Sequence, residues 1–166
     1  REDDLENGWQ QLCDKHITKD DIVVGFSASG TTPFVLSILK HCRKEGIPTG
    51  CIVNNPHSPI AEWADYEVEV ITGPEFVTGS TRMKAGTSQK LILDMISTTL
   101  QIRQGRVEGN KMVNAELINH KLIDRACRIF MERNSEYKDY EEVRQLILKA
   151  GSVKKAEMMI SRHFDM

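Results

Sequence analysis

The sequence lacks the features that mark several large classes of protein. Its four cysteines include no CxxC pair, and its five histidines form no metal-binding pattern such as HExxH. Its 22 basic and 24 acidic residues leave a net charge of −2, which gives no field to attract nucleic acid or an anionic membrane. No apolar run is long enough to span a bilayer, and no signal-peptide pattern is present. These absences predict a cytoplasmic protein with reduced thiols, no metal, no nucleic-acid partner and no membrane association.

The composition is that of an ordinary globular protein. Hydrophobic residues make up 40% and charged residues 28% of the 166-residue chain, so it can bury a core. We expect one domain with a small appendage. The chain begins at Arg1 rather than at a methionine and continues with the acidic run 2–6. We interpret this as a sequence that enters a longer protein partway, so that an N-terminal portion is missing.

The first half of the chain alternates between strand and helix patterns. The short apolar runs 22–26 and 49–53 are typical of parallel strands that are covered on both faces. The run 66–71 alternates in polarity, which predicts a strand nearer the edge of the sheet. Helical patterns at 33–45 and 59–64 lie between the strands. This rhythm predicts an α/β fold with a mostly parallel sheet, whose ligands lie at the carboxyl ends of the strands.

Helical patterns also begin the chain and dominate its second half. Apolar residues at helical spacing predict helices over 3–15, about 81–103 and about 116–133. Two short amphipathic helices follow, separated by Gly151, and Ser152 is expected to cap the second of them. We interpret the last part of the chain as a small helical subdomain.

The segment 27–32, with the sequence SASGTT, joins the first predicted strand to the helix that begins at Pro33. Its hydroxyls and backbone N–H groups would converge on the positive end of the helix dipole, as an anion site requires. It lacks the lysine of a P-loop and the glycine spacing of a dinucleotide site, so ATP and NAD fit poorly. Such a neutral turn suits a phosphate monoester that stays bound and is not transferred. The alternative is a capped turn that binds no ligand.

Two segments resemble a known family. The hydroxyls of Ser27, Ser29 and Thr32 match the SxSGxT phosphate loop of sugar isomerase (SIS) domains. The segment 73–90, GPEFVTGSTRMKAGTSQK, is similar almost position for position to the signature shared by muramic acid phosphate etherases and glucokinase regulatory proteins. Shorter pieces further along also resemble the etherases, so the resemblance covers essentially the whole chain; these pieces are residues 96–98, 105–107 and 109–114.

This resemblance implies a particular organisation of the chain. Residues 1–134 would form a three-layer SIS-type α/β domain that binds phosphosugars and lacks its N-terminal part. Residues 135–166 would form the small helical subdomain. The chain would thus be the C-terminal half of an etherase, and the first sugar-binding loop and one catalytic glutamate would lie outside it.

The resemblance also implies a function. The etherases are carbon–oxygen lyases that cleave the lactyl ether of N-acetylmuramic acid 6-phosphate by elimination and hydration, giving N-acetylglucosamine 6-phosphate and D-lactate. No metal or redox cofactor is implied, and a homodimer with its site at the subunit interface is expected. The main alternative is a non-catalytic phosphosugar-binding regulator resembling glucokinase regulatory protein. Sugar-phosphate isomerisation is a third possibility, which shares the proton abstraction but releases no lactate.

The resemblance also designates the candidate site residues. The phosphate would be bound by the turn that contains Ser27, Ser29, Gly30, Thr31 and Thr32. Thr31 departs from the etherase pattern, which usually has arginine at this position, so one positive contact is lost.

Three ionisable residues complete the candidate site. Glu2, in an acidic motif resembling that of the family, is the candidate catalytic base, although acidic residues before a helix commonly only oppose its dipole. Glu75 and Lys84 lie in the signature segment and could contact substrate. The alternatives are that Glu75 caps the backbone and that Lys84 is solvated. The pair Asn54-Asn55 could bind sugar hydroxyls, but Asn-Asn-Pro is first of all a turn.

Overall fold

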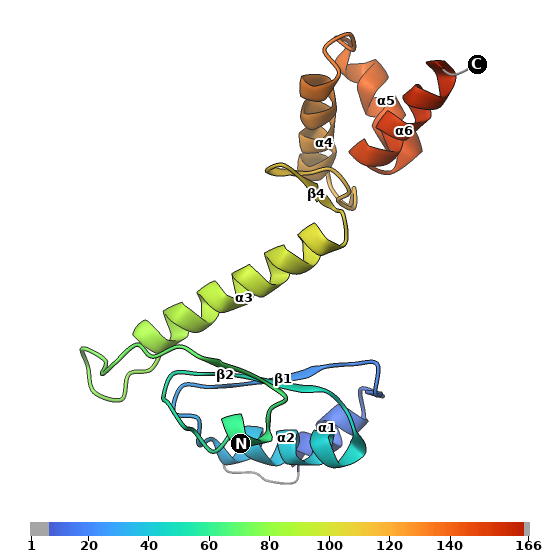
Figure 1. The fold of residues 1–166 in the computed structure, drawn as a ribbon. Helices are drawn as coiled ribbons and strands as arrows, with labels where there is room; N and C mark the ends of the chain where they lie inside the picture. Colours follow the sequence, from blue (N-terminus) through green and yellow to red (C-terminus); the bar gives the residue numbers. More distant parts are fainter. Residues whose placement is uncertain (1–6, 165–166) are drawn as a thin grey trace. The chain divides into compact units, whose positions relative to one another are not determined.

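The computed structural model describes residues 7–164, with the side chains of residues 8–161. The chain divides into two compact units, with the boundary in the sequence between Asp94 and Met95. Figure 1 shows the elements of both units. Helix α3 (Lys84–Arg103) runs through this boundary, so the chain passes from one unit to the other inside a helix.

The first unit is built on a three-stranded parallel sheet. Its strands are β1 (Val23–Ser27), β2 (Thr49–Val53) and β3 (Tyr66–Glu69), in the order β1-β2-β3. Helix α2 (Pro33–Glu45) connects β1 to β2, and the short 3-10 helix η1 (Ala61–Trp63) precedes β3. The predicted parallel α/β rhythm is confirmed, and β3 lies at an edge of the sheet as expected. The bounds of α2 and β2 are those predicted, because each has an uninterrupted pattern between turn-forming residues.

One face of the sheet is covered by helices. Helices α1 (Asn7–Cys13) and α2 lie on the same side of the strands (Figure 1). At Gly25 the helix approaches so closely that a Cβ atom would lie 2.5 Å from a methyl group of Val35, which explains why a glycine interrupts the apolar strand. The buried core between sheet and helix consists of Leu39, Cys51, Val53, Ile60 and Ala61.

The other face of the sheet is unevenly covered within the described residues, since Ile52 of the central strand is 1% exposed whereas the flanking strands are more open. Val24 and Tyr66 flank Gly50 in register, and their side chains point away from α2 because neighbouring residues of a strand face opposite sides. Val24 is 37% and Tyr66 66% exposed. The first strand is therefore only partly covered on this face, less than its apolar pattern predicts, whereas the second strand is buried along its whole length.

The second unit is a helical cluster preceded by a short hairpin. Its core joins all three helices to the segment after the hairpin, through Val113, Phe130, Val143, Ile147 and Val153. The elements are β4 (Val107–Glu108), β5 (Lys111–Met112), α4 (His120–Arg133), α5 (Tyr140–Ala150) and α6 (Val153–Phe164).

The ends of these helices follow the sequence closely. Asn119 caps α4 and Asp139 caps α5, each by accepting backbone N–H bonds in the first turn. The predicted cap of the last helix is confirmed, since the Ser152 hydroxyl accepts the N–H of Lys155 at 3.3 Å. Gly151 separates the two helices with φ of 83°.

The structural division differs from the one expected from the sequence. The sequence predicts a boundary after residue 134, which assigns α4 to the first domain. In the structure, α4 shares its buried face with α5 and α6 and so belongs to the second unit. The functional domain boundary at residue 134 stays a prediction.

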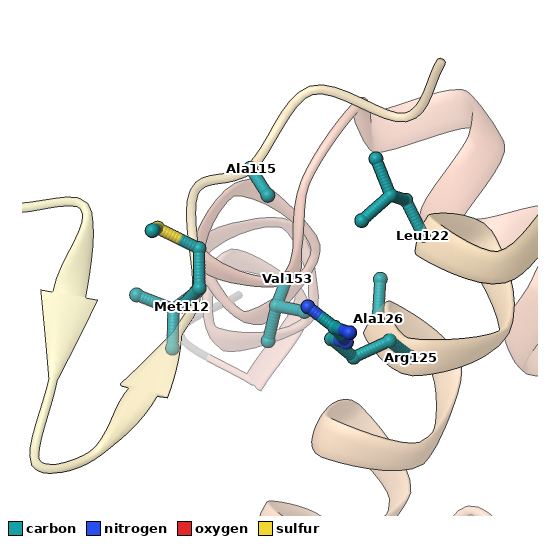
Figure 2. A pocket seen from close by; sticks show the side chains of 7 residues that line it. Met112, Ala115, Leu122, Arg125, Ala126 and Val153 are labelled. Atoms are coloured by element: carbon teal, nitrogen blue, oxygen red, sulfur yellow. The ribbon is translucent and has the colours of Figure 1, made fainter. Parts of the chain in front are cut away.

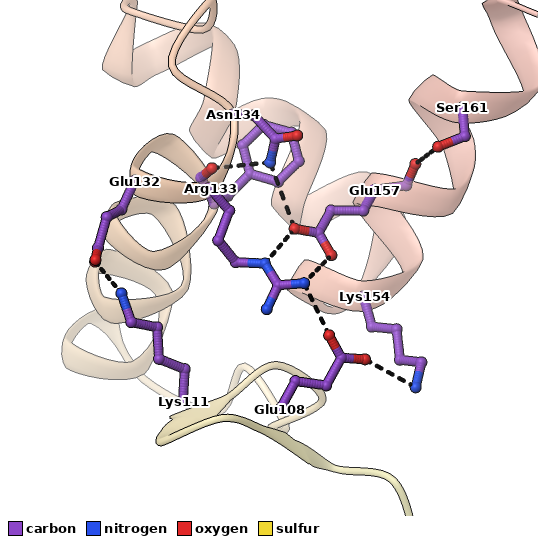
Figure 3. A network of polar contacts seen from close by, with 9 residues as sticks. Glu108, Lys111, Glu132, Arg133, Asn134, Lys154, Glu157 and Ser161 are labelled. Carbon is purple, nitrogen blue, oxygen red and sulfur yellow. Dashed lines mark hydrogen bonds and ion pairs between the residues drawn. The ribbon is translucent and has the colours of Figure 1, made fainter.

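A network of charges fastens the hairpin to the helical cluster (Figure 3). The Arg133 guanidinium donates to Glu157 at 2.7 Å and to Glu108 at 2.8 Å, and Lys154 lies 3.1 Å from Glu108. These hydrogen bonds lower the pKa of Glu108, so its carboxylate stays ionised at neutral pH. The hairpin is therefore held on α4 and α6 by charge-assisted hydrogen bonds.

A small hollow lies beside the hairpin of the second unit. Figure 2 shows Met112, Ala115, Leu122 and Arg125 around it. Its volume of about 20 Å³ has room for about one water molecule. It is too small for a sugar phosphate. None of the helices in the described part of the chain is both long and apolar enough to cross a membrane.

Candidate functional site

The loops that follow the three strands meet at one edge of the sheet. Because the strands are parallel, their carboxyl ends point the same way. The loop after β2 is bonded to the loop after β1: the backbone N–H of Asn54 and the side-chain amide of Asn55 both donate to the carbonyl of Ala28, at 3.2 and 2.9 Å. The backbone N–H of Ile60 donates to the carbonyl of Gly30 at 3.1 Å. This edge is the candidate site.

The segment 27–32, here called the hydroxyl turn, gathers its four hydroxyls into one cluster. Ser27 Oγ lies 2.8 Å from Thr32 Oγ1 and 3.3 Å from Ser29 Oγ. Thr31 Oγ1 donates to Ser29 Oγ at 2.9 Å. Ser27 is buried, whereas Ser29 and Thr31 are exposed. The sequence-predicted phosphate residues are therefore brought together, at the N-terminus of α2.

Two of the four hydroxyls form hydrogen bonds with backbone N–H groups of the turn. Ser27 Oγ accepts the N–H of Gly30 at 3.0 Å, and Ser29 Oγ accepts the N–H of Thr31 at 3.2 Å. A hydroxyl that accepts an N–H keeps its own proton for another acceptor. Thr32 occupies the N-cap position of α2 but makes no side-chain capping bond. None of the O–H protons is donated to the main chain in these bonds: three bonds join the hydroxyls to one another, and their protons can turn to an anion that binds beside the positive end of the 13-residue helix.

Gly30 is required by the shape of the turn. Its φ of 74° lies in the left-handed region, which residues with a side chain adopt at a cost. A Cβ atom on Gly30 would also lie 2.1 Å from the Cβ of Ser58. Ser58 lies in the loop after β2 and is 3% exposed. The two loops are therefore in direct contact at this glycine.

Asn54 ties the edge of the sheet to α3. Its side-chain amide donates to the carbonyl of Val70 at 2.9 Å and to Ser88 Oγ at 2.8 Å, and its oxygen accepts from the amide of Gln89 at 2.9 Å. All these groups belong to the first unit. The amide of Asn54 therefore has a structural role: its hydrogen bonds hold the first turns of α3 at the carboxyl edge of the sheet.

Glu75 and Lys84 both have structural partners in the described chain. The Glu75 carboxylate accepts the backbone N–H groups of Lys84 at 2.8 Å and Ala85 at 3.0 Å, so it caps the N-terminus of α3. These bonds hold the pKa of Glu75 below its ordinary value. The Lys84 ammonium donates to the carbonyl of Pro74 at 2.9 Å. Their predicted contact with substrate stays a prediction.

The candidate base, possible metal ligands and the cysteine thiols are the other groups that could carry chemistry. Glu2, the candidate base, lies outside the described residues. Within residues 7–164, no three histidine, cysteine, aspartate or glutamate side chains converge as a metal site would need. Burial raises the pKa of Cys42, Cys51 and Cys127, which keeps these thiols protonated and unreactive.

Sequence reasoning missed three residues at this edge. Ser88 and Gln89 lie in the signature segment, and helical spacing alone gives no reason to pair them with Asn54. Ser58 lies between His57 and Pro59, in a stretch that reads only as a turn. All three follow predicted strands in the sequence. Since parallel strands end at the same edge of the sheet, this position could have indicated that they lie near the site.

The fold and this edge define the class of protein. The family model described as SIS domain matches residues 9–98, which is more than half of the chain. The chain therefore belongs to the SIS-domain family, and its α/β fold with a parallel sheet and a following helical part is that of an SIS domain with an added helical unit.

Several curated relatives of the chain are named as N-acetylmuramic acid 6-phosphate etherases. An N-acetylmuramic acid 6-phosphate etherase of Bacteroides thetaiotaomicron is 54% identical over 98% of this chain and 58% of its own length. Etherases of Porphyromonas gingivalis and Christiangramia forsetii are 54% and 51% identical, over 92% and 93% of this chain and 55% and 56% of theirs. The chain thus spans a little over half the length of the curated relatives it matches.

Proposed function

We propose that the protein to which this chain belongs is a carbon–oxygen lyase that cleaves the lactyl ether of N-acetylmuramic acid 6-phosphate. The products are N-acetylglucosamine 6-phosphate and D-lactate. The observation that carries the proposal is the hydroxyl cluster of Ser27, Ser29 and Thr32 at the N-terminus of α2. Relatives about half identical to this chain are named for this etherase activity, which favours the lyase over a non-catalytic regulator.

In this proposal the hydroxyl turn, including Gly30 and Thr31, binds the phosphate of the substrate. The O–H protons of the cluster donate to phosphate oxygens, and the dipole of α2 favours their negative charge. No group in the turn can activate the phosphorus, so the phosphate is not transferred. Its role is to bind the substrate and to fix the position of the sugar. Glu75 and Lys84 belong to the proposed site because they build the start of α3 at the same edge.

The chemistry at the sugar needs a base and an acid. The base removes the proton beside the carbonyl of the open-chain sugar, and the acid protonates the departing ether oxygen. We assign the base to Glu2, as the resemblance to the etherases implies. The acid lies outside this chain in the same proposal, so activity requires the full-length polypeptide. Water then adds to the unsaturated aldehyde, and no cofactor is needed to balance these steps.

We further propose a cytoplasmic homodimer with the site at the subunit interface. Exposed apolar side chains on α3 support an interface: Leu91 is 50% and Leu93 47% exposed in the first unit. Sedimentation of the full-length protein tests this part. A monomer at micromolar concentration contradicts it.

The activity itself is tested by incubating the full-length protein with N-acetylmuramic acid 6-phosphate and measuring D-lactate. Ser29→Ala is expected to weaken substrate binding by roughly ten- to a hundredfold, as the loss of one hydrogen bond to a charged group predicts. Glu2→Gln is expected to abolish lactate release and to spare binding. Ser161→Ala, in the helical unit, is the control and should change neither. Absence of lactate with folded wild-type protein refutes the lyase.

A further inference from the structure

Ser58 has a buried hydroxyl without a hydrogen-bond partner. Among the buried side-chain nitrogen and oxygen atoms of the described residues, Ser58 Oγ is the one that makes no hydrogen bond. Leaving such a hydroxyl unpaired in the interior destabilises a fold, because the group loses its hydrogen bonds to water and gains none in exchange. An alanine would fill nearly the same space without that cost. The hydroxyl is therefore unfavourable for the conformation in which it is seen.

The hydroxyl lies beside the glycine of the hydroxyl turn. It is 2.5 Å from the place that a Cβ atom of Gly30 would occupy, so the missing side chain of Gly30 leaves the space that Ser58 fills. The carbonyl of Gly30 accepts the N–H of Ile60, two residues after Ser58. The N–H of Gly30 is held by Ser27 Oγ, a member of the hydroxyl cluster. The peptides around Gly30 thus connect Ser58 to the groups proposed to bind phosphate.

The loop holds Ser58 in this place by several bonds. The preceding residue, His57, has a φ of 53°, a left-handed conformation that is unfavourable for a residue with a side chain. Its N–H donates to a carboxylate oxygen of Glu69 at 2.8 Å, which fixes the turn. The carbonyl of Ser58 accepts the N–H of Ala61 at 3.0 Å. The side chain is therefore presented to Gly30 by a loop that bears strain to do so.

We propose that Ser58 is a positioning residue for the phosphate turn, whose hydroxyl gains its hydrogen bond only in the phosphosugar-bound conformation of that turn. This inference rests on the proposed phosphate site. When the cluster hydroxyls turn their protons to the phosphate, Ser27 Oγ and the peptides at Gly30 readjust, and Ser58 Oγ is paired in the new arrangement. A group that is unpaired in the free state and paired in the bound state shifts the equilibrium towards binding. Ser58 thereby increases affinity at the expense of stability.

The test is Ser58→Ala in the full-length protein, with N-acetylglucosamine 6-phosphate as the binding probe. We expect the melting temperature of the ligand-free variant to equal or exceed that of the wild type. We expect its affinity for the probe to fall about three- to tenfold, because one hydrogen bond is lost from the bound state. In the lactate assay KM should rise with little change in kcat, as for a residue that acts on binding alone.

Ser152→Ala is the matched control. Ser152 is as buried as Ser58, at 2% exposed, but its hydroxyl is paired with the N–H of Lys155. Its loss should lower the melting temperature and leave affinity unchanged. The two variants should thus differ in both measurements: Ser58→Ala lowers affinity without lowering the melting temperature, and Ser152→Ala lowers the melting temperature without lowering affinity. This difference distinguishes a positioning role from a packing role. A Ser58→Ala protein that melts lower and binds the probe like the wild type overturns the inference.

The outcomes also separate this inference from the proposed function. If wild-type protein fails to bind the probe, or if Ser29→Ala binds as well as the wild type, the phosphate site itself is refuted. If the wild type binds and Ser29→Ala weakens binding while Ser58→Ala does not, only the role of Ser58 is refuted.

Discussion

Replacing Asn54 by alanine should loosen the carboxyl edge of the sheet. Asn54 is 6% exposed, and its amide makes three hydrogen bonds, to Val70, Ser88 and Gln89. Each contributes about 1 kcal/mol net, so the variant should lose about 3 kcal/mol of stability. For a protein of this size, 1 kcal/mol corresponds to roughly 2–4 °C in melting temperature, which predicts a decrease of roughly 6–12 °C.

The neighbouring asparagine gives a matched control for this prediction. Asn55 is exposed and donates a single bond, to the carbonyl of Ala28 at 2.9 Å. Asn55→Ala should therefore cost at most about 1 kcal/mol. Thermal unfolding of both full-length variants, followed by circular dichroism, makes the comparison. Equal shifts for the two variants refute the reasoning, because they would mean that the bonds from Asn54 to the end of β3 and to α3 contribute nothing.

Other contacts in the two units are open to the same kind of test. Gly30→Ala should abolish phosphosugar binding and lower the melting temperature, because its methyl group would collide with Ser58; binding and melting curves of the full-length variant measure both, and wild-type affinity would contradict it. The pKa of Glu75 is lowered by folding, so its stabilising effect is present above its ordinary value of 4.5 and is lost as pH falls through the lower folded value. Melting temperatures of wild-type protein should therefore fall more steeply below about pH 4.5 than those of Glu75→Gln, and parallel pH profiles would contradict this. Arg133→Met should lower the urea midpoint, because it removes the partner of two carboxylates, Glu108 and Glu157. Arg128→Met, at a more exposed pair, should change the midpoint little; equal decreases for the two variants would refute the difference.

Local structure and family membership can be read from the residues alone. Apolar patterns predict the helix 33–45 and the strand 49–53 with the bounds they have in the structure, because these patterns are long and end at turn-forming residues. The hydroxyl turn is predicted as an anion site from its residue types and its place between a strand and a helix, with a capped turn that binds no ligand as the alternative. The signature segment 73–90 indicates the etherases, and the relatives agree.

Which residues meet at the site depends on how the chain folds in three dimensions. Ser58 rests on Gly30, 28 positions before it in the sequence, and Gln89 binds Asn54, 35 positions before it. Glu75 is a candidate for contact with substrate on its sequence, and the structure uses its carboxylate to cap α3. Local periodicity contains no information on such pairs, because they exist only where the loops of parallel strands converge on one edge of the sheet.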